Sequence, residues 1–249
     1  MFPLRDNIPT DRFPVVTLAL IIANVLMYFF FQKGGISFGE PSSQHFLCNL
    51  YEYGTIPQEV THPGTQLQAQ GCETFTAPTW LTLFTSMFMH GGLFHLGGNM
   101  LFLWIFGNNV EDAMGPVKFL VFYLLAGLAA DAGQIAVSLN SQVPSIGASG
   151  AVAGVLGGYL LLFPRARVVT LVFIIFFFTI IELPAIFFLG IWIIQQAVFA
   201  YFDLFQPSGG GGGVAYFAHI GGFVFGLLAV KLFANERRRQ RQLERSGLR

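Results

Sequence analysis

The feature that most constrains this chain is a series of apolar runs, each close to the length that crosses a lipid bilayer. A hydrocarbon core about 30 Å thick is spanned by about 20 apolar residues in an α-helix. Six runs reach or approach that length: 13–31, 83–110, 119–137, 146–163, 183–202 and 216–233. The composition agrees, with 54% hydrophobic and 10% charged residues. We therefore predict an all-α membrane protein built as a bundle of six transmembrane helices.

A seventh apolar run, at 168–181, reads VVTLVFIIFFFTII and is followed by Glu182 and Pro184. It is short for a helical span. We expect this segment to be interfacial or re-entrant, and a further span stays open as the alternative.

The basic residues are unevenly distributed across the predicted topology. Six spans place both termini on one side, and Lys33 is the only basic residue in the opposite loops. The side of the termini carries Arg5, Arg12, Lys118, Arg165, Arg167, Lys231 and the Arg-rich tail. The positive-inside rule then makes both termini cytoplasmic. The first run lacks a small-residue cleavage site after it, so we expect it to remain as an anchor.

These runs predict one membrane domain at 13–233. A cytoplasmic segment at 1–12 precedes it and a basic cytoplasmic tail at 234–249 follows it. An external loop at about 32–82 joins the first two spans, and Gly209–Gly213 form a flexible linker before the last span.

The only two cysteines, Cys48 and Cys72, both lie in the external loop. An oxidising compartment would permit a disulfide between them. Two unpaired thiols remain the alternative, because spacing alone does not establish the geometry. No Cys/His pattern typical of a metal site occurs, so we expect no metal.

Polar side chains inside the predicted spans are the candidate functional residues, because a charge in hydrocarbon costs about 2.5 to 3.5 kcal/mol. They are Asn24, His90, His95, Asn99, Asp131, Gln134, Ser149, Gln195, Gln196 and His219. His95 and Asn99 are one helical turn apart and therefore share a face.

Ser149 and His219 each head a helical track of small residues. Gly150 follows the serine, and Gly222 and Gly226 follow the histidine. Such tracks let helices approach closely. Taken alone, the first track favours a purely structural serine, bonded to its own preceding turn in a tightly packed helix.

Depth in the membrane favours a site. His95, Ser149 and His219 precede the inner ends of their spans by 14 or 15 residues. At 1.5 Å per residue they lie roughly 21 to 23 Å above the cytoplasmic boundary, nearer the outer surface. The three groups therefore share one predicted level, within reach of water from outside.

These groups are the parts of a nucleophilic acyl-transfer site. Neutral His219 can take the hydroxyl proton of Ser149 and later give it to the leaving amine. Asn99, His95 and the backbone N–H of Ser149 can donate hydrogen bonds to the oxyanion. A Ser/His dyad is the simplest arrangement of these residues.

The remaining polar groups are interpreted as structural. Asp131 is the only acid well inside a span, and we interpret it, with Gln134, as an interhelical polar contact. His90 lies on another helical face, and we expect it to brace the external loop by hydrogen bonding. The same helix-contact interpretation applies to Asn24, Gln195 and Gln196.

Three ordered motifs resemble those of the rhomboid intramembrane serine proteases. They are HxxxN in HGGLFHLGGNMLFLWIFGNNVED, GxSG in GASGAVAGVLGGYLLLFPRARV and AHxxG in AHIGGFVFG, within about Thr79 to Phe233. The resemblance implies a six-helix bundle with Ser149 as nucleophile and His219 as base, without a third acid. It also implies that His95 and Asn99 assist the oxyanion.

The resemblance further implies that Glu111 is structural and that substrates are single-pass membrane proteins cut near their outer ends. The supporting residues are Gly147, Gly150, Gly222, Gly226, His90 and Glu111. We expect transmembrane-helix substrates and membrane lipid as partners, no cofactor and no nucleic acid; nothing in the sequence sets an oligomeric state. We expect a bacterial plasma membrane, and the alternative function is a catalytically silent rhomboid-like protein that binds transmembrane helices.

Two positions depart from the pattern of that family. Many members carry a Trp-Arg pair before the second span, where this chain has Trp80, Leu81 and Thr82. Some members have a tyrosine four residues after the serine that stacks on the histidine, where this chain has Ala153. The sequence leaves open which aromatic residue orients the histidine, Phe223 being one candidate.

Overall fold

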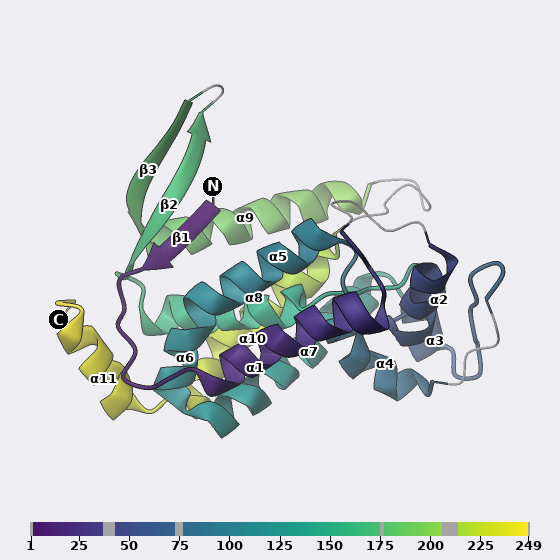
Figure 1. Cartoon of the computed structure of the whole chain (residues 1–249), viewed down its shortest axis with the longest axis horizontal. Helices are drawn as coiled ribbons and strands as arrows, with labels where there is room; N and C mark the ends of the chain where they lie inside the picture. Colours follow the sequence, from purple (N-terminus) through teal and green to yellow (C-terminus); the bar gives the residue numbers. More distant parts are fainter. Residues whose placement is uncertain (1, 37–42, 73–76, 175–176, 206–213, 249) are drawn as a thin grey trace.

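A computed structural model describes residues 2–36, 43–72, 77–174, 177–205 and 214–248. Most of these residues are helical, and the helices pack into an elongated bundle (Figure 1). The linker predicted at Gly209–Gly213 lies outside the described residues.

Three described helices are long and apolar enough to cross a membrane: α7 (Pro116–Val137), α9 (Ala185–Asp203) and α10 (Tyr216–Phe233). Two shorter apolar runs join them. One is α1 (Val15–Leu26) continued by the π-helical η1 (Met27–Phe31), and the other is α8 (Ser149–Leu162).

The run predicted as the second span, 83–110, is not one helix. Helix α4 (Thr79–Thr85) and the 3-10 turn η2 (Ser86–Phe88) come first. After a break, the chain continues as α5 (Leu93–Phe102), η3 (Leu103–Gly107) and α6 (Asn108–Met114). Gly91 and Gly92 lie in the break, where glycine disfavours helix. The predicted start of this span was therefore wrong by about three turns.

The run at 168–181 forms a β-hairpin, so the all-α prediction is wrong here. Strands β2 (Arg167–Ile174) and β3 (Phe177–Pro184) pair antiparallel, and β1 (Phe2–Asp6) pairs with the other edge of β2. Valine, isoleucine, threonine and phenylalanine dominate the segment, and these residues favour strands. The hairpin projects from the bundle beside α9 (Figure 1).

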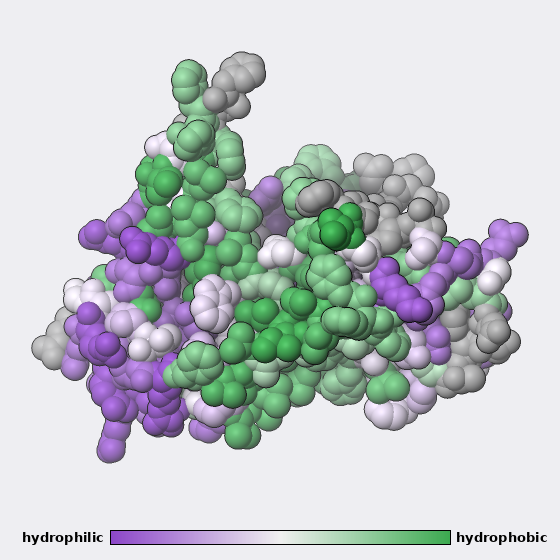
Figure 2. Space-filling model, viewed as in Figure 1, coloured by the Kyte–Doolittle hydropathy of each residue, from purple (hydrophilic) through white to green (hydrophobic). Residues whose placement is uncertain are grey.

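The C-terminal helix contacts the segment that follows β1 at one end of the bundle. Helix α11 (Glu236–Arg245) places Arg245 against Asp11, and the backbone N–H of Asp11 donates to Asp112. Figure 2 shows hydrophilic residues at this end, apolar residues across the middle, and hydrophilic residues again around α2 (Gln44–Tyr53) and α3 (Pro57–Thr61). This polar-apolar-polar pattern is typical of a protein embedded in a bilayer.

Small residues bring α8 and α10 into backbone contact. A Cβ at Gly222 would lie 2.0 Å from the carbonyl oxygen of Gly150, and one at Gly226 would lie 2.0 Å from that of Gly154. A Cβ at Gly157 would likewise lie 2.2 Å from the Phe223 carbonyl oxygen. This packing sets the distance between the first residue of α8 and the first turn of α10.

Candidate active site

Ser149 and His219 meet where α8 and α10 begin. Ser149 is the first residue of α8, and His219 is the fourth residue of α10. The hydroxyl Oγ lies 2.8 Å from the imidazole Nε2, although 70 positions separate the two residues in the sequence. The histidine is 8% exposed and Ser149 is half-buried, so the imidazole is largely shielded from bulk solvent while the hydroxyl is partly accessible.

The other ring nitrogen of His219 contacts α9. Its Nδ1 lies 2.8 Å from Oε1 of Gln196, and this contact is buried. A carbonyl oxygen only accepts, so Nδ1 carries the hydrogen and Nε2 is free to accept from Ser149. Trp192, one turn before Gln196, places its ring 5.8 Å from the imidazole ring. The ring of Phe223 packs against Trp192, with 6.0 Å between the ring centroids. Among the described residues, the aromatic ring that contacts the histidine is therefore that of Trp192 and not that of Phe223.

Sequence reasoning missed these roles of Gln196 and Trp192. Gln196 was interpreted as a helix-contact group, which is true but incomplete. The sequence signal for this pair was the four-residue spacing between Trp192 and Gln196, because residues four apart lie on the same helical face. Gln195 could not be told from Gln196 without knowing how α9 is rotated.

The ring of His95 lies beside Gly147, two residues before Ser149. Its Nδ1 accepts a hydrogen bond from the backbone N–H of Gly91, at 3.2 Å. The hydrogen of the neutral ring is then on Nε2. A Cβ at Gly147 would lie 2.7 Å from that Nε2 and 3.5 Å from Ser149 Oγ, and Gly147 has a φ of +122°. The absent side chain at Gly147 lets the ring approach the serine.

Two further groups are candidate hydrogen-bond donors. Asn99 lies one turn after His95 and is 8% exposed, and its Nδ2 has no hydrogen-bond partner among the described residues. The first N–H groups of a helix have no partner within it and lie at its positive end, which holds for Ser149 in α8. These N–H groups are of the kind that would stabilise a negative charge developing beside Ser149.

A small cavity of about 20 Å³ adjoins Ser149 and is lined by Ser86, Asp131 and Ser145 among others. That volume is enough for about one water molecule. Because Gln196 and Ser149 occupy both nitrogens of His219, Asp131 is not the partner of the histidine. Gln134 does make an interhelical contact, since its Oε1 accepts from the backbone N–H of Ala218 at 3.3 Å.

The other predicted residues lie around this centre. His90 is buried, and its backbone N–H and C=O form hydrogen bonds with the side chain of Gln32, at 2.9 and 3.0 Å. Neither ring nitrogen has a partner among the described residues. Glu111 accepts from the N–H groups of Val16 and Thr17 and from the Thr17 hydroxyl, and so caps α1. Cys48 and Cys72 form a disulfide.

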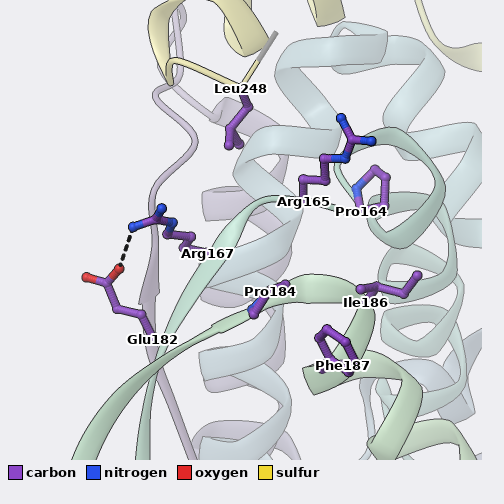
Figure 3. Close-up of a pocket in the computed structure, with 8 residues that line it drawn as sticks. All are labelled: Pro164, Arg165, Arg167, Glu182, Pro184, Ile186, Phe187 and Leu248. Carbon is purple, nitrogen blue, oxygen red and sulfur yellow. Dashed lines mark hydrogen bonds and ion pairs between the residues drawn. The ribbon is translucent and has the colours of Figure 1, made fainter.

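A larger cavity, of about 530 Å³, lies away from Ser149 at the base of the hairpin (Figure 3). It is lined by Pro164, Arg165, Arg167, Glu182, Pro184, Ile186, Phe187 and Leu248. It holds an exposed ion pair between Arg167 and Glu182 but no nucleophile with a base. No group of three or more metal-ligating side chains occurs in the described part of the chain.

Comparison with known proteins identifies the family. A model of the Rhomboid domain matches residues 77–236. Rhomboid protein 1, mitochondrial, of Saccharomyces cerevisiae is 31% identical over 176 residues, which are 67% of this chain and 46% of the yeast protein. Rhomboid protease GluP of Bacillus subtilis is 34% identical over 147 residues, or 59% and 24% of the two chains.

Rhomboid-like protein 11, chloroplastic, of Arabidopsis thaliana is 39% identical over 77 residues, or 31% of this chain and 27% of that protein. The matches span less than half the length of each of these three relatives. Two of these relatives are named as mitochondrial and chloroplastic proteins, so the comparisons do not support the expected location in a bacterial plasma membrane. The motifs, the site and the matched domain lead to one conclusion: this chain is an integral membrane protein that belongs to the rhomboid family.

Proposed function

We propose that this chain is an intramembrane serine endopeptidase with Ser149 as nucleophile and His219 as general base. The observation that carries the proposal is the 2.8 Å contact between Ser149 Oγ and His219 Nε2. It joins two apolar helices, among which a polar pair is costly unless it has a function. The name of the Bacillus subtilis relative, a rhomboid protease, supports the same reaction.

The geometry supports a two-step acyl transfer. Ser149 Oγ attacks the substrate carbonyl carbon while His219 Nε2 takes the hydroxyl proton, and the carbon–nitrogen bond breaks as His219 protonates the leaving amine. Water then attacks the acyl-enzyme ester, gives a proton to His219, and the serine leaves with that proton. His95 Nε2–H, Asn99 Nδ2–H and the Ser149 N–H stabilise the oxyanion in both steps.

The proposed setting is a six-span domain at 13–233 with both termini in the cytoplasm. The spans are α1 with η1, α5 to α6, α7, α8, α9 and α10. The contact between α11 and the N-terminal segment supports a common side for the termini, and the arginines of α11 favour the cytoplasm. Ser149, at the start of α8, then lies toward the outer surface.

The proposed substrates are single-pass membrane proteins. A peptide bond inside a regular helix is hydrogen-bonded and shielded, so the substrate must unwind before Ser149 can reach it. Small or helix-breaking residues near the outer end of the substrate should favour cleavage. The small cavity beside Ser149 could supply the water for the second step.

A catalytically silent protein that only binds transmembrane helices is the competing function. Such a protein needs neither a nucleophile nor a base. The contact between Ser149 and His219, together with the donors around it, favours the protease.

The test is cleavage of a membrane-embedded reporter helix by the purified protein in liposomes. We expect the wild type to cleave it, and Ser149→Ala and His219→Ala to abolish cleavage. Ser141→Ala, in the loop before α8, is the matched control and should cleave at the wild-type rate. Equal cleavage by Ser149→Ala would show that the nucleophile is wrongly assigned.

A further inference from the structure

The base of the site is held from a third helix. Gln196 projects from α9 and is buried, and its Oε1 lies 2.8 Å from Nδ1 of His219. Because Nε2 of the same ring contacts Ser149, the imidazole bridges α9 and α8. A role for Gln196 goes beyond a Ser/His dyad.

We propose that Gln196 is a positioning residue that keeps the hydrogen of neutral His219 on Nδ1 and leaves Nε2 free to accept the proton of Ser149. This proposal rests on the proposed protease function. Neutral imidazole has two tautomers. In the wrong one, an Nε2–H would face Ser149 Oγ and could not accept its proton. With its carbonyl oxygen toward Nδ1, as in this structure, Gln196 stabilises the productive tautomer, because in the other tautomer an Nδ1 lone pair would face an acceptor.

A neutral amide fits this position better than a carboxylate would. A buried carboxylate carries a desolvation cost that a low-dielectric environment makes severe. An amide supplies a directed carbonyl dipole without a net charge. When His219 becomes protonated during attack, the same oxygen still accepts from Nδ1–H, so the residue serves both charge states of the ring.

The rotation of α9 separates Gln196 from its neighbour Gln195. Gln196 and Trp192 lie one turn apart and both contact the imidazole, whereas Gln195 is exposed, rotated about 100° from Gln196 around the helix. Trp192 packs against the imidazole ring of His219, and Gln196 contacts Nδ1 at the edge of that ring. Gln195 therefore provides a control with the same chemistry on the same helix.

The kinetic test compares Gln196→Met, Gln196→Glu and Gln195→Met in the reporter assay. Methionine keeps the length of the side chain but removes the strong acceptor, and we expect kcat to fall about 10-fold to 100-fold with KM changed less than about 2-fold. Glutamate retains an acceptor oxygen and should therefore keep more of the wild-type kcat than methionine does, although its buried carboxylate carries a desolvation cost. Gln195→Met should match the wild type. An unchanged kcat for Gln196→Met would overturn the proposal.

A spectroscopic test does not depend on cleavage. In protein labelled with ¹⁵N-histidine, the His219 signals, assigned by their loss in His219→Ala, should show a protonated Nδ1 and an unprotonated Nε2. Gln196→Met should raise the fraction with hydrogen on Nε2. A wild-type ring with hydrogen on Nε2 would overturn the proposal even if Gln196→Met fails to fold.

The two readouts separate the two proposals. If the wild type does not cleave the reporter, the protease function fails while the tautomer of His219 still decides the role of Gln196. If the wild type cleaves and Ser149→Ala does not, the function stands and the Gln196 variants decide the positioning role alone.

Discussion

Helices α10 and α9 both contribute to the site, but they are held in different ways. In α10, a Cβ at Gly222 would lie 2.0 Å from the Gly150 carbonyl oxygen. In α9, a Cβ at Gly190 would meet nothing within 4 Å. Helix α10 is therefore held by backbone contact with α8, whereas α9 reaches the site through the side chains of Gln196 and Trp192.

This difference shows which helix contact fixes the distance between Ser149 and His219. Lipid is as apolar as leucine, so transmembrane helices associate through close packing and hydrogen bonds rather than through the hydrophobic effect. The distance from Ser149 to His219 depends on glycines that admit no side chain. Most of α9 presents large residues outward, including Ile194 at 64% exposed, and should tolerate change there.

The largest effect is expected from Gly222→Ala. The added methyl group collides with the Gly150 carbonyl, and backbone on both sides cannot yield without separating α8 from α10. We expect cleavage to fall more than about 100-fold, with a loss of stability of about 1 to 3 kcal/mol from overpacking. Gly190→Ala is the matched control in α9 and should retain wild-type cleavage and unfolding temperature. Similar behaviour of the two variants would remove the basis of the comparison.

Reducing the disulfide tests the end of the molecule outside the bundle. The bond between Cys48 and Cys72 closes a loop with a sequence separation of 24. In the chain-entropy model a loop of this size contributes about 3.5 kcal/mol. We expect Cys48→Ser to lower the free energy of unfolding by about that amount, while the initial rate of reporter cleavage per folded molecule stays near that of the wild type. A selective loss of cleavage would show that the loop shapes the site.

Glu111→Gln extends the comparison to α1. The side chain of Glu111, in α6, forms hydrogen bonds to the first turn of α1. The carboxylate accepts three hydrogen bonds from Val16 and Thr17, and an amide nitrogen would oppose one of these donors. We expect a loss of about 2 kcal/mol in a denaturation titration. Glu182→Ala, which removes an exposed ion pair at 3.5 Å, should cost less than about 0.5 kcal/mol. Equal losses would mean that capping of α1 is unimportant.

The smallest effect concerns pH. Burial raises the pKa of Asp6 from 3.8 to about 7, against the hydrogen bond from Tyr159, which lowers it. Between about pH 4 and pH 7 the folded state holds a proton that the unfolded state has lost, so stability falls as pH rises and levels off above 7. We expect a fall of about 1 kcal/mol between pH 6 and pH 8.

Asp6→Asn should remove that fall, because an amide does not titrate in this range. The measurement is a pair of unfolding curves at each pH. A slope that persists in Asp6→Asn would assign the titration to another group. The glycine-packed site should not be affected, because Asp6 contacts the far end of α8 at Tyr159.

Much of the site could be predicted from the sequence, because its parts are marked by short-range spacing. His95 and Asn99 share a face by their separation alone, and the common depth of Ser149 and His219 follows from counting residues along apolar helices. The family assignment from these motifs is confirmed by the matched domain. The bounds of α10 also coincide with the predicted run.

The parts that could not be predicted depend on rotation or on competing propensities. Gln195 and Gln196 are neighbours of the same residue type, and only the orientation of α9 determines which of them contacts His219. The residues at 168–181 are apolar enough for a lipid environment and also favour β-strands. The pairing of this run with β1 is a long-range contact that the local sequence does not encode. The break at Gly91 and Gly92 was hidden by apolar residues on both sides.

The measurement that tests the central claim most directly is covalent labelling with a fluorophosphonate, mapped by peptide mass spectrometry. The account predicts a single adduct on Ser149 in the wild type, the same adduct in Gly190→Ala, and none in His219→Ala or Gly222→Ala. An adduct on another serine, or undiminished labelling of Ser149 after His219→Ala, would contradict an account in which close packing of α8 and α10 creates the nucleophile.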